Sequence, residues 1–207
     1  MSARSDEAKK VEMAKILHKI DALKFGVFKL TSGKVSPYYI DLRIVPSFPD
    51  AFRQICDFYG ESIISQIGLK NFDRIAGIPI AGIPFASQIA YNLKKPFLYV
   101  RKGVRLHGRQ RRVEGILVSG DRVLLVEDLV TTGLTLKKAA AAVTAEGGVV
   151  KEAVALLDRE EGGKEKLAKN GIQLHALLKI SEVANTLYEI GTLDKESLKT
   201  ILKQIKK

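Results

Sequence analysis

The sequence predicts an α/β protein built on a doubly wound, mostly parallel sheet. Three observations support this fold class. From residue 74 onward, segments with strand and helix character alternate, their connections are short, and segment 122–128 is a continuous apolar run. Alternating strands and helices favour a parallel sheet with helices on both faces. A continuous apolar run is typical of a strand buried in the middle of such a sheet.

The region before residue 74 predicts two helices and an extended segment. Apolar residues recur at helical spacing over 6–23, where Ser5 or Asp6 is a candidate cap. Glycines, serines and a proline then predict turn-rich, extended chain up to about residue 48. Pro49 is suited to the first turn of a second helix, and Gly68 is suited to end it.

The region after residue 74 predicts the sheet itself. Strands are expected at 74–78, 97–101, 122–128, 150–158 and 172–180, and helices at 82–93, from about 134 to 146 and at 164–170. Segment 102–115 has no apolar periodicity, so we expect a polar loop. We expect one domain over residues 1–181, followed by a peripheral helical tail over 182–207.

Length and composition narrow the class of protein. A chain of 207 residues with 46% hydrophobic residues can bury a substantial core, and general disorder is not expected. Cys56 is the only cysteine, which argues against a secreted domain held by disulfides. The N-terminus has no apolar stretch typical of a signal peptide, and no run approaches 18 apolar residues. These features predict a cytoplasmic protein without a membrane partner.

The charge is strongly basic. Lys and Arg total 34 against 23 Asp and Glu, a formal net charge of +11. A basic protein favours nucleic acid, a membrane surface or phosphorylated small molecules as partners. The lysines of the C-terminal segment alternate with Leu and Ile and predict the solvated face of an amphipathic helix. The arginine-rich segment 101–112 is denser and indicates a functional role.

Segment 123–135, VLLVEDLVTTGLT, is the most informative motif. An apolar strand ends at two adjacent acids, Glu127 and Asp128, and a hydroxyl-rich turn follows at the start of a helix. The carboxyl ends of strands in an open parallel sheet line the ligand crevice. Backbone N–H groups at a helix N-terminus bind anions. Acids beside an anion cradle suit a ligand that carries both hydroxyls and phosphate. The alternative is a pair of acids that only cap the next helix.

This motif resembles the 5-phosphoribosyl 1-diphosphate (PRPP) signature of the type I phosphoribosyltransferases. The resemblance implies that Glu127 and Asp128 hold the ribose hydroxyls. It also implies that the following loop holds the 5-phosphate through Thr131, Thr132, Gly133, Leu134 and Thr135. Leu134 departs from the family, which usually has Ser or Thr there. Its amide can still donate a hydrogen bond, although a hydroxyl is lost.

Three further segments resemble the orotate phosphoribosyltransferases in particular. They are KLTSGKVSPYYIDLR (29–43), RKGVRLHGRQRRVEG (101–115) and LLDREEGGKEKL (156–167). The resemblance implies a small N-terminal hood and the conversion of orotate and PRPP to orotidine 5′-monophosphate and diphosphate in pyrimidine biosynthesis. It also implies a Mg²⁺ cofactor. The metal would be carried by PRPP, and protein side chains alone would not bind it.

Segment 101–115 is expected to be a flexible catalytic loop. The resemblance assigns catalytic roles to Arg101, Lys102, Arg105 and His107, with the loop closing over PRPP in the neighbouring subunit of a homodimer. These cations suit the negative charge that develops on the departing diphosphate. Arg105 replaces the lysine of many members, and the two side chains are not equivalent. His107 is expected to donate a hydrogen bond. A solvated basic loop and a nucleic-acid patch remain alternatives.

The resemblance also implies which residues bind orotate. Arg159 is expected to pair with the orotate carboxylate, Thr131 to reach it from the PRPP loop, and Tyr38 and Tyr39 to lie beside the base. The alternatives are core packing for the tyrosines and a surface ion pair with Glu160 or Glu161 for Arg159.

Two family lysines are missing. Thr31 stands at one position, where Lys29 or Lys34 could compensate, and GIPIAG (77–82) replaces the other. The backbone of Ala81 and Gly82 could still approach diphosphate closely.

Three other functions remain open at this point. They are a purine phosphoribosyltransferase, a phosphoribosyltransferase-like regulator that binds nucleic acid, and a basic assembly module. A nucleic-acid surface is not favoured, because no aromatic residue is interleaved with the arginines of 101–112.

Overall fold

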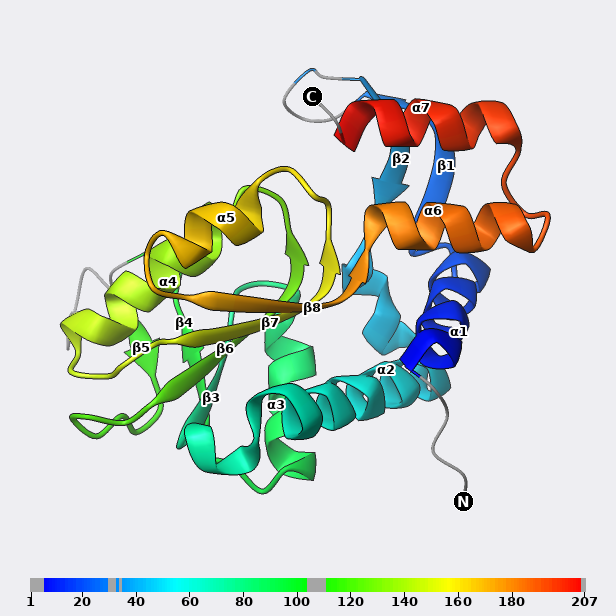
Figure 1. The fold of residues 1–207 in the computed structure, drawn as a ribbon. Coiled ribbons are helices and arrows are strands. Elements are labelled where there is room, and N and C mark those ends of the chain that lie inside the picture. The colour runs from blue at the N-terminus through cyan, green and yellow to red at the C-terminus, as the bar shows by residue number, and fades with distance from the viewer. Residues whose placement is uncertain (1–5, 30–32, 34, 104–110, 206–207) are drawn as a thin grey trace. The chain divides into compact units, whose positions relative to one another are not determined.

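The computed structural model describes residues 6–29, 33, 35–103 and 111–205. The chain forms two compact units (Figure 1). The first unit combines the chain up to Ile55 with the chain from Leu178 onward, and the second unit runs from Cys56 to Leu177. The boundaries fall inside helix α2 (Pro49–Ser62) and strand β8 (Gln173–Lys179).

A six-stranded sheet in the order β5-β4-β3-β6-β7-β8 organises the described residues of the second unit. Its other strands are β3 (Arg74–Gly77), β4 (Phe97–Val100), β5 (Val113–Glu114), β6 (Val123–Val130) and β7 (Glu152–Asp158). Strands β3, β4, β6 and β7 pair in parallel, and β5 pairs antiparallel with β4. The predicted doubly wound, mostly parallel sheet is confirmed.

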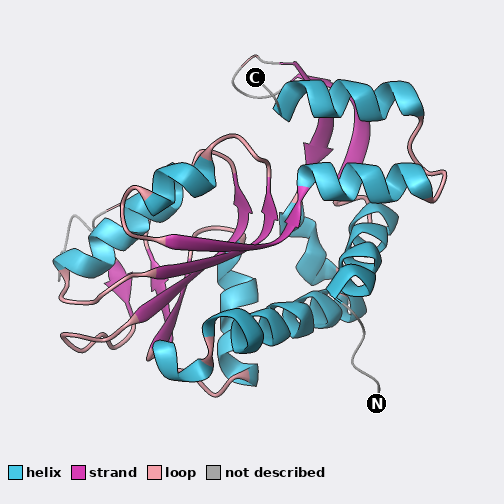
Figure 2. Cartoon of the chain, viewed as in Figure 1, coloured by secondary structure: helices cyan, strands magenta, loops and turns pink. Residues whose placement is uncertain are grey.

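Helices cover both faces of this sheet (Figure 2). Helix α3 (Gly82–Asn92) packs on β3 and β6, whereas α4 (Leu134–Ala145) packs on β4 and β6 and also contacts α5 (Gly163–Ala168). The apolar face of α4, including Leu136, Ala139 and Val143, is buried with Leu98 and Leu125 of the sheet. Burial of both faces explains the continuous apolar run of β6.

The sheet reverses its winding between β3 and β6. The chain leaves β3 through α3 and returns as β4 on one side, and it leaves β6 through α4 and returns as β7 on the other. The carboxyl ends of two strands that diverge in this way form a crevice, which is the general ligand position of open α/β sheets. The motif over 123–135 begins with β6, which is one of the two strands at this switch point.

The first unit combines the N-terminal and C-terminal segments of the chain. It contains α1 (Asp6–Lys19), the antiparallel pair β1 (Leu23–Lys29) and β2 (Val35–Ile40), and the C-terminal helices α6 (Ile180–Glu189) and α7 (Lys195–Ile205). Helix α6 packs on α1, where Lys10 Nζ lies 2.9 Å from Glu182 Oε1, and α7 contacts α6 and β2. A 3₁₀ helix over Leu42–Ser47 leads into α2.

The structure differs from the sequence predictions at several places. The end of the predicted polar loop 102–115 forms β5, and β6 runs on to Val130 because Leu129 and Val130 pair with β7. Helix α2 ends in a π-helical turn over Ile63–Ile67 before Gly68, and a 3₁₀ turn spans Leu69–Asn71. The C-terminal segment is helical as predicted. However, it packs within the first unit, so the unit boundary near residue 177 differs from the predicted domain boundary at 181.

Within the described ranges, no helix is both long enough and apolar enough to cross a membrane.

Candidate active site

The acid pair lies in β6, two residues before the end of the strand. Glu127 is only 5% exposed, and the backbone N–H of Asp128 donates to Glu127 Oε1 over 3.2 Å. Burial, with a hydrogen bond and a negative charge from Asp128, raises the pKa of Glu127 to about 10. Glu127 therefore keeps its proton at neutral pH. The pair can both donate and accept hydrogen bonds, which suits neighbouring hydroxyl groups.

Glycine allows α3 to begin directly against this acid pair. A Cβ atom on Gly82 would lie 2.7 Å from the Val126 carbonyl oxygen and 3.1 Å from the Glu127 Cα. The same Val126 carbonyl accepts a hydrogen bond from the Ile78 N–H over 3.0 Å. The turn after β3 and the backbone of β6 are therefore held in close contact at the switch point.

The predicted phosphate loop is a tight turn between β6 and α4. Gly133 has a φ of 72°, in the left-handed region that favours glycine, and α4 begins at Leu134. Thr132, Leu134 and Thr135 are exposed, so the first turn of α4 is open to a ligand. The N–H groups of this turn and the helix dipole suit a phosphate group.

Gly163 supports this loop from α5. A Cβ atom there would lie 2.8 Å from the Thr131 carbonyl oxygen and 2.7 Å from Val130 Cγ1. Gly133 meets the same helix, because its own Cβ would lie 3.0 Å from the Gly163 carbonyl oxygen. Sequence reasoning did not assign Gly163 a role. The only signal was the Gly-Gly step at 162–163 within a segment already considered functional.

Arg159 lies beside the phosphate loop at the end of β7. Its backbone N–H donates to the Val130 carbonyl over 2.9 Å, and its Nη2 lies 3.0 Å from Glu161 Oε1. This ion pair is one of the alternatives that the sequence left open. The preceding Asp158 is only 4% exposed, and burial raises its pKa.

The base of the predicted catalytic loop is a closely bonded stem. The Arg101 N–H donates to the Arg112 carbonyl over 2.7 Å, and Arg101 Nη1 lies 3.1 Å from Glu114 Oε1. The carboxylate of Glu146, at the end of α4, accepts from the N–H groups of Arg112 and Val113 over 2.8 and 3.0 Å. Glu146 is a further residue that sequence reasoning missed, because its partners are more than 30 residues away.

A basic pocket of about 290 Å³ lies between this stem and the first turns of α4. Four cationic residues, Arg101, Lys102, Arg112 and Lys138, line it together with Ile78, Pro79, Val100, Leu134, Thr135 and Ala139. The pocket thus brings two predicted catalytic cations together with two residues of the phosphate loop. The positive charge of Lys102 also acts to lower the pKa of Glu127, although burial is the larger effect.

Several predicted residues lie elsewhere. Arg105 and His107, as well as Thr31 and Lys34, fall outside the described residues. Tyr38, Tyr39 and Lys29 belong to the first unit. Tyr38 is buried at 2% exposure, whereas Tyr39 is 37% exposed with its ring centroid 5.7 Å from that of Phe28. Of the two tyrosines, Tyr39 is the more accessible to a ligand.

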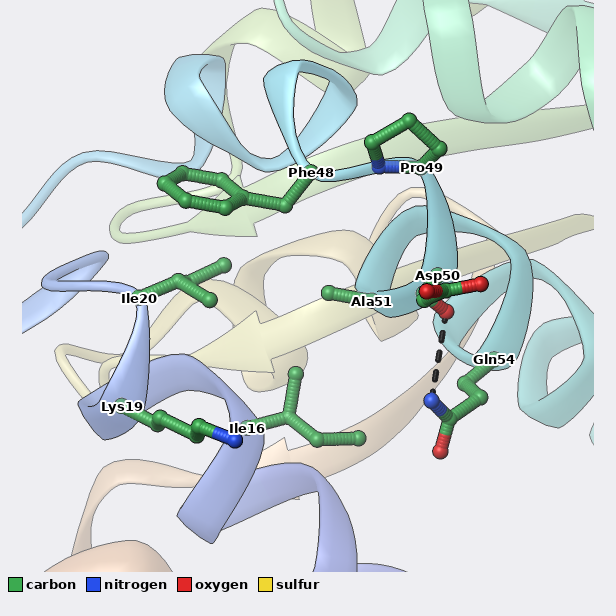
Figure 3. Close-up of a pocket in the computed structure, with 8 residues that line it drawn as sticks. All are labelled: Ile16, Lys19, Ile20, Phe48, Pro49, Asp50, Ala51 and Gln54. Atoms are coloured by element: carbon green, nitrogen blue, oxygen red, sulfur yellow. Dashed lines mark hydrogen bonds between the residues drawn. The ribbon is translucent and has the colours of Figure 1, made fainter.

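The first unit contains an apolar pocket of about 320 Å³ at the junction of α1 and α2 (Figure 3). Ile16 and Ile20 line it from the α1 side, and Phe48 and Ala51 line it from the start of α2. Asp50 and Gln54 form a hydrogen bond at its edge, from Gln54 Nε2 to the Asp50 carbonyl over 3.3 Å. None of the predicted site residues lines this pocket.

The described residues contain no group of three or more His, Cys, Asp or Glu side chains arranged to hold a metal ion. Because Glu127 keeps its proton, only Asp128 of the acid pair can act as a carboxylate ligand. Mg²⁺ in phosphate-transfer sites is often bound by one or two carboxylates together with substrate phosphates. The donor set therefore fits a metal that arrives with a phosphorylated substrate, and it does not fit an all-protein metal site.

Comparison with known proteins agrees with this geometry. Residues 50–184 match the phosphoribosyl transferase domain model. The chain is 40% identical to an orotate phosphoribosyltransferase from Cenarchaeum symbiosum over 185 residues, covering 89% of this chain and 92% of that protein.

Two solved structures are also similar. The orotate phosphoribosyltransferase from Aeropyrum pernix is 31% identical, with a TM-score of 0.71, and the match covers 86% of this chain and 99% of that one. The UMP synthase of Leishmania donovani is 31% identical, with a TM-score of 0.84. That match covers 97% of this chain but only 43% of the longer protein.

A doubly wound sheet with an acid pair and a phosphate loop at its switch point, together with the domain match, defines a type I phosphoribosyltransferase. The chain belongs to the orotate phosphoribosyltransferases of pyrimidine biosynthesis within that family.

Proposed function

We propose that this enzyme transfers the phosphoribosyl group of PRPP to orotate, which gives orotidine 5′-monophosphate and diphosphate. The observation that carries the proposal is the adjacency of the acid pair Glu127–Asp128 and the open first turn of α4 at the switch point of the sheet. The acid pair suits ribose hydroxyls, and the first turn of α4 suits a terminal phosphate. Five residues, 129–133, lie between Asp128 and the start of α4 at Leu134, which suits a sugar phosphate that carries both groups.

The chain's own residues bind and orient PRPP in this scheme. The turn from Thr131 to Thr135 receives the 5-phosphate through backbone N–H groups, and Gly133 and Gly163 keep that turn in place. The protonated Glu127 and its partner Asp128 hold the ribose hydroxyls. Fixing the sugar at two points holds C1 in one position for attack, and such positioning supplies much of the rate enhancement in group transfer.

The chemical step breaks the bond between ribose C1 and the diphosphate oxygen and forms a bond between C1 and a ring nitrogen of orotate. The proton of that nitrogen passes to the departing diphosphate. Positive charge develops on the sugar as in glycoside hydrolysis, and negative charge develops on the departing diphosphate. Arg101 and Lys102, together with Arg105 and His107 of the same loop, are proposed to stabilise the leaving group. Preorganised donors of this kind act most strongly where water is excluded.

For orotate, we assign the carboxylate to Arg159 and Thr131, and the ring to Tyr38 and Tyr39. The position of Arg159 beside Val130 supports its assignment, because it lies next to the phosphate loop. Its ion pair with Glu161 would have to exchange for the pair with orotate. Partial exposure of Tyr39 supports its contact with a ligand more directly than the burial of Tyr38 does.

A Mg²⁺ ion carried by PRPP would neutralise phosphate charge, and Glu127 and Asp128 are the residues that would face it. We also propose that the enzyme is a homodimer in which the loop over 101–115 acts on PRPP bound to the neighbouring subunit. The bonded stem at Arg101, Arg112 and Glu146 supports a loop that projects from a fixed base.

The direct test measures the loss of orotate absorbance with purified protein, Mg²⁺ and PRPP. We expect turnover that requires both PRPP and orotate. Turnover with adenine, hypoxanthine or guanine, and none with orotate, would assign the chain to a purine enzyme of the same fold.

Arg159→Ala should raise the KM for orotate more than it lowers kcat. Arg105→Ala should lower kcat about 10²- to 10³-fold, as loss of a preorganised donor does in other enzymes.

A further inference from the structure

Tyr59 is a buried polar residue that the proposed mechanism does not use. It lies in the second half of α2, and its side chain is fully buried at 0% exposure. Its hydroxyl donates to the backbone carbonyl of Glu127 over 2.7 Å. A hydroxyl buried at this depth needs a partner, and here the partner is the main chain of the residue that begins the acid pair.

The same hydroxyl also reaches the neighbouring strand. The backbone of Leu156 in β7 acts to lower the pKa of Tyr59, although burial raises that pKa more strongly. The β6–β7 register pairs Glu127 with Ala155 and then Leu129 with Leu157. Asp128 and Leu156 are the positions between these pairs. The Tyr59 hydroxyl therefore bonds to the main chain of β6 and lies near that of β7 at the point where the acid pair lies.

Two other contacts fix the same stretch of backbone. Gly82 of α3 packs against the carbonyl of Val126 and the Cα of Glu127, and the Ile78 N–H donates to that Val126 carbonyl. The peptide that joins Glu127 to Asp128 is thus held by Tyr59 next to a backbone that α3 already restrains. The ring of Tyr59 is itself fixed against Phe85, with ring centroids 5.8 Å apart.

We propose that Tyr59 is a positioning residue, which through its hydroxyl sets the orientation of Glu127 and Asp128 toward the ribose of PRPP. This inference rests on the proposed function, because it assigns Tyr59 to the ribose end of the same site. It predicts a selective effect. Loss of the hydroxyl should weaken contacts made by the acid pair and leave contacts made by the phosphate loop unchanged.

The test compares Tyr59→Phe with the unmodified enzyme, using two ligands that divide the site. Ribose 5-phosphate needs both the acid pair and the phosphate loop, whereas inorganic phosphate needs only the loop. Calorimetric titration should show about three- to tenfold weaker binding of ribose 5-phosphate, the range expected for one hydrogen bond. Binding of inorganic phosphate should not change. In steady-state assays the KM for PRPP should rise by a similar factor.

Phe72→Leu is the matched control, because it alters another fully buried aromatic residue of the second unit, which lies just before β3. It should lower stability without changing the ratio of ribose 5-phosphate to phosphate affinity. Equal weakening of both ligands in Tyr59→Phe, or no change in either, would overturn the inference. An unmodified enzyme that binds ribose 5-phosphate but does not convert orotate would instead overturn the proposed function.

Discussion

Glu127, which we propose holds the ribose of PRPP, has an unusually high affinity for its proton. Its pKa is raised to about 10, mainly by burial, whereas the ordinary value is 4.5. Between these two values the folded protein holds a proton that the unfolded chain releases. The stabilising contribution is therefore complete at low pH and is lost as the pH rises toward 10. Glu127→Gln keeps the shape of the protonated side chain and removes the titration.

We expect Glu127→Gln to become more stable relative to the unmodified protein as the pH rises from 5 to 9. The difference should grow by at most about 1.4 kcal/mol per pH unit. Chemical denaturation at several pH values measures it. Asp73→Asn is the control, because a hydrogen bond from Arg122 lowers the pKa of Asp73 and confines its effect to acid pH. A pH-independent difference for Glu127→Gln between pH 5 and 9 would contradict a buried, protonated carboxyl group.

Gly163 has no side chain, and this lets α5 pack closely against the predicted phosphate loop. Gly163→Ala would place Cβ within 2.8 Å of the Thr131 carbonyl oxygen, so the phosphate loop or α5 has to move. We expect about tenfold or greater loss of inorganic phosphate and PRPP affinity, since small displacements at a positioned site are costly. Gly60→Ala is the matched control, because its Cβ would meet only Leu93 Cδ2 at 3.8 Å. Equal affinities for both variants would show that the contact is not needed.

At the scale of elements, the apolar pattern predicts strands and helices that have long continuous or periodic runs. It does not predict elements or hydrogen bonds that depend on residues far away in the sequence. The run at β6 and the alternation around it were sufficient to predict the sheet. Strand β5 could not be predicted, because it has two residues and forms only by pairing with β4. The hydrogen bond of Tyr59 could not be predicted either, since the hydroxyl's partner lies 68 residues away. Such long-range contacts leave no periodic pattern in the local sequence from which they could be predicted.

The loop stem gives a prediction at the same scale. Glu146→Ala removes the acceptor for the N–H groups of Arg112 and Val113 and should loosen the base of the loop. We expect kcat to fall about tenfold with a smaller change in the KM for orotate, because loop closure often limits turnover. Glu146→Gln retains an acceptor oxygen and should restore most of the rate. Equal losses in both variants would indicate that the charge of Glu146 matters and not the hydrogen bonds.

At the scale of the molecule, the residues assigned to one reaction come from distant parts of the chain. The acid pair, the phosphate loop and Arg159 belong to the second unit, whereas Tyr38 and Tyr39 belong to the first. The first unit is itself closed by a contact between Lys10 and Glu182, which are 172 residues apart. Resemblance to a family could assign these residues to one site, but composition and periodicity could not.

The proposed exchange of loops between subunits is testable by complementation. Arg105→Ala disables the loop, and Asp128→Ala disables the ribose site of the same chain. If each loop serves the neighbouring subunit, a mixed dimer has one site with both defects and one intact site. Since random reassociation makes half of the dimers mixed, about one quarter of the unmodified activity should return when the two inactive variants are mixed. A loop that serves its own subunit would leave every site defective, and mixing would then restore no activity. Size-exclusion chromatography with light scattering checks that the mixed sample contains dimers, so that absence of recovery in a dimeric sample would refute the exchange itself.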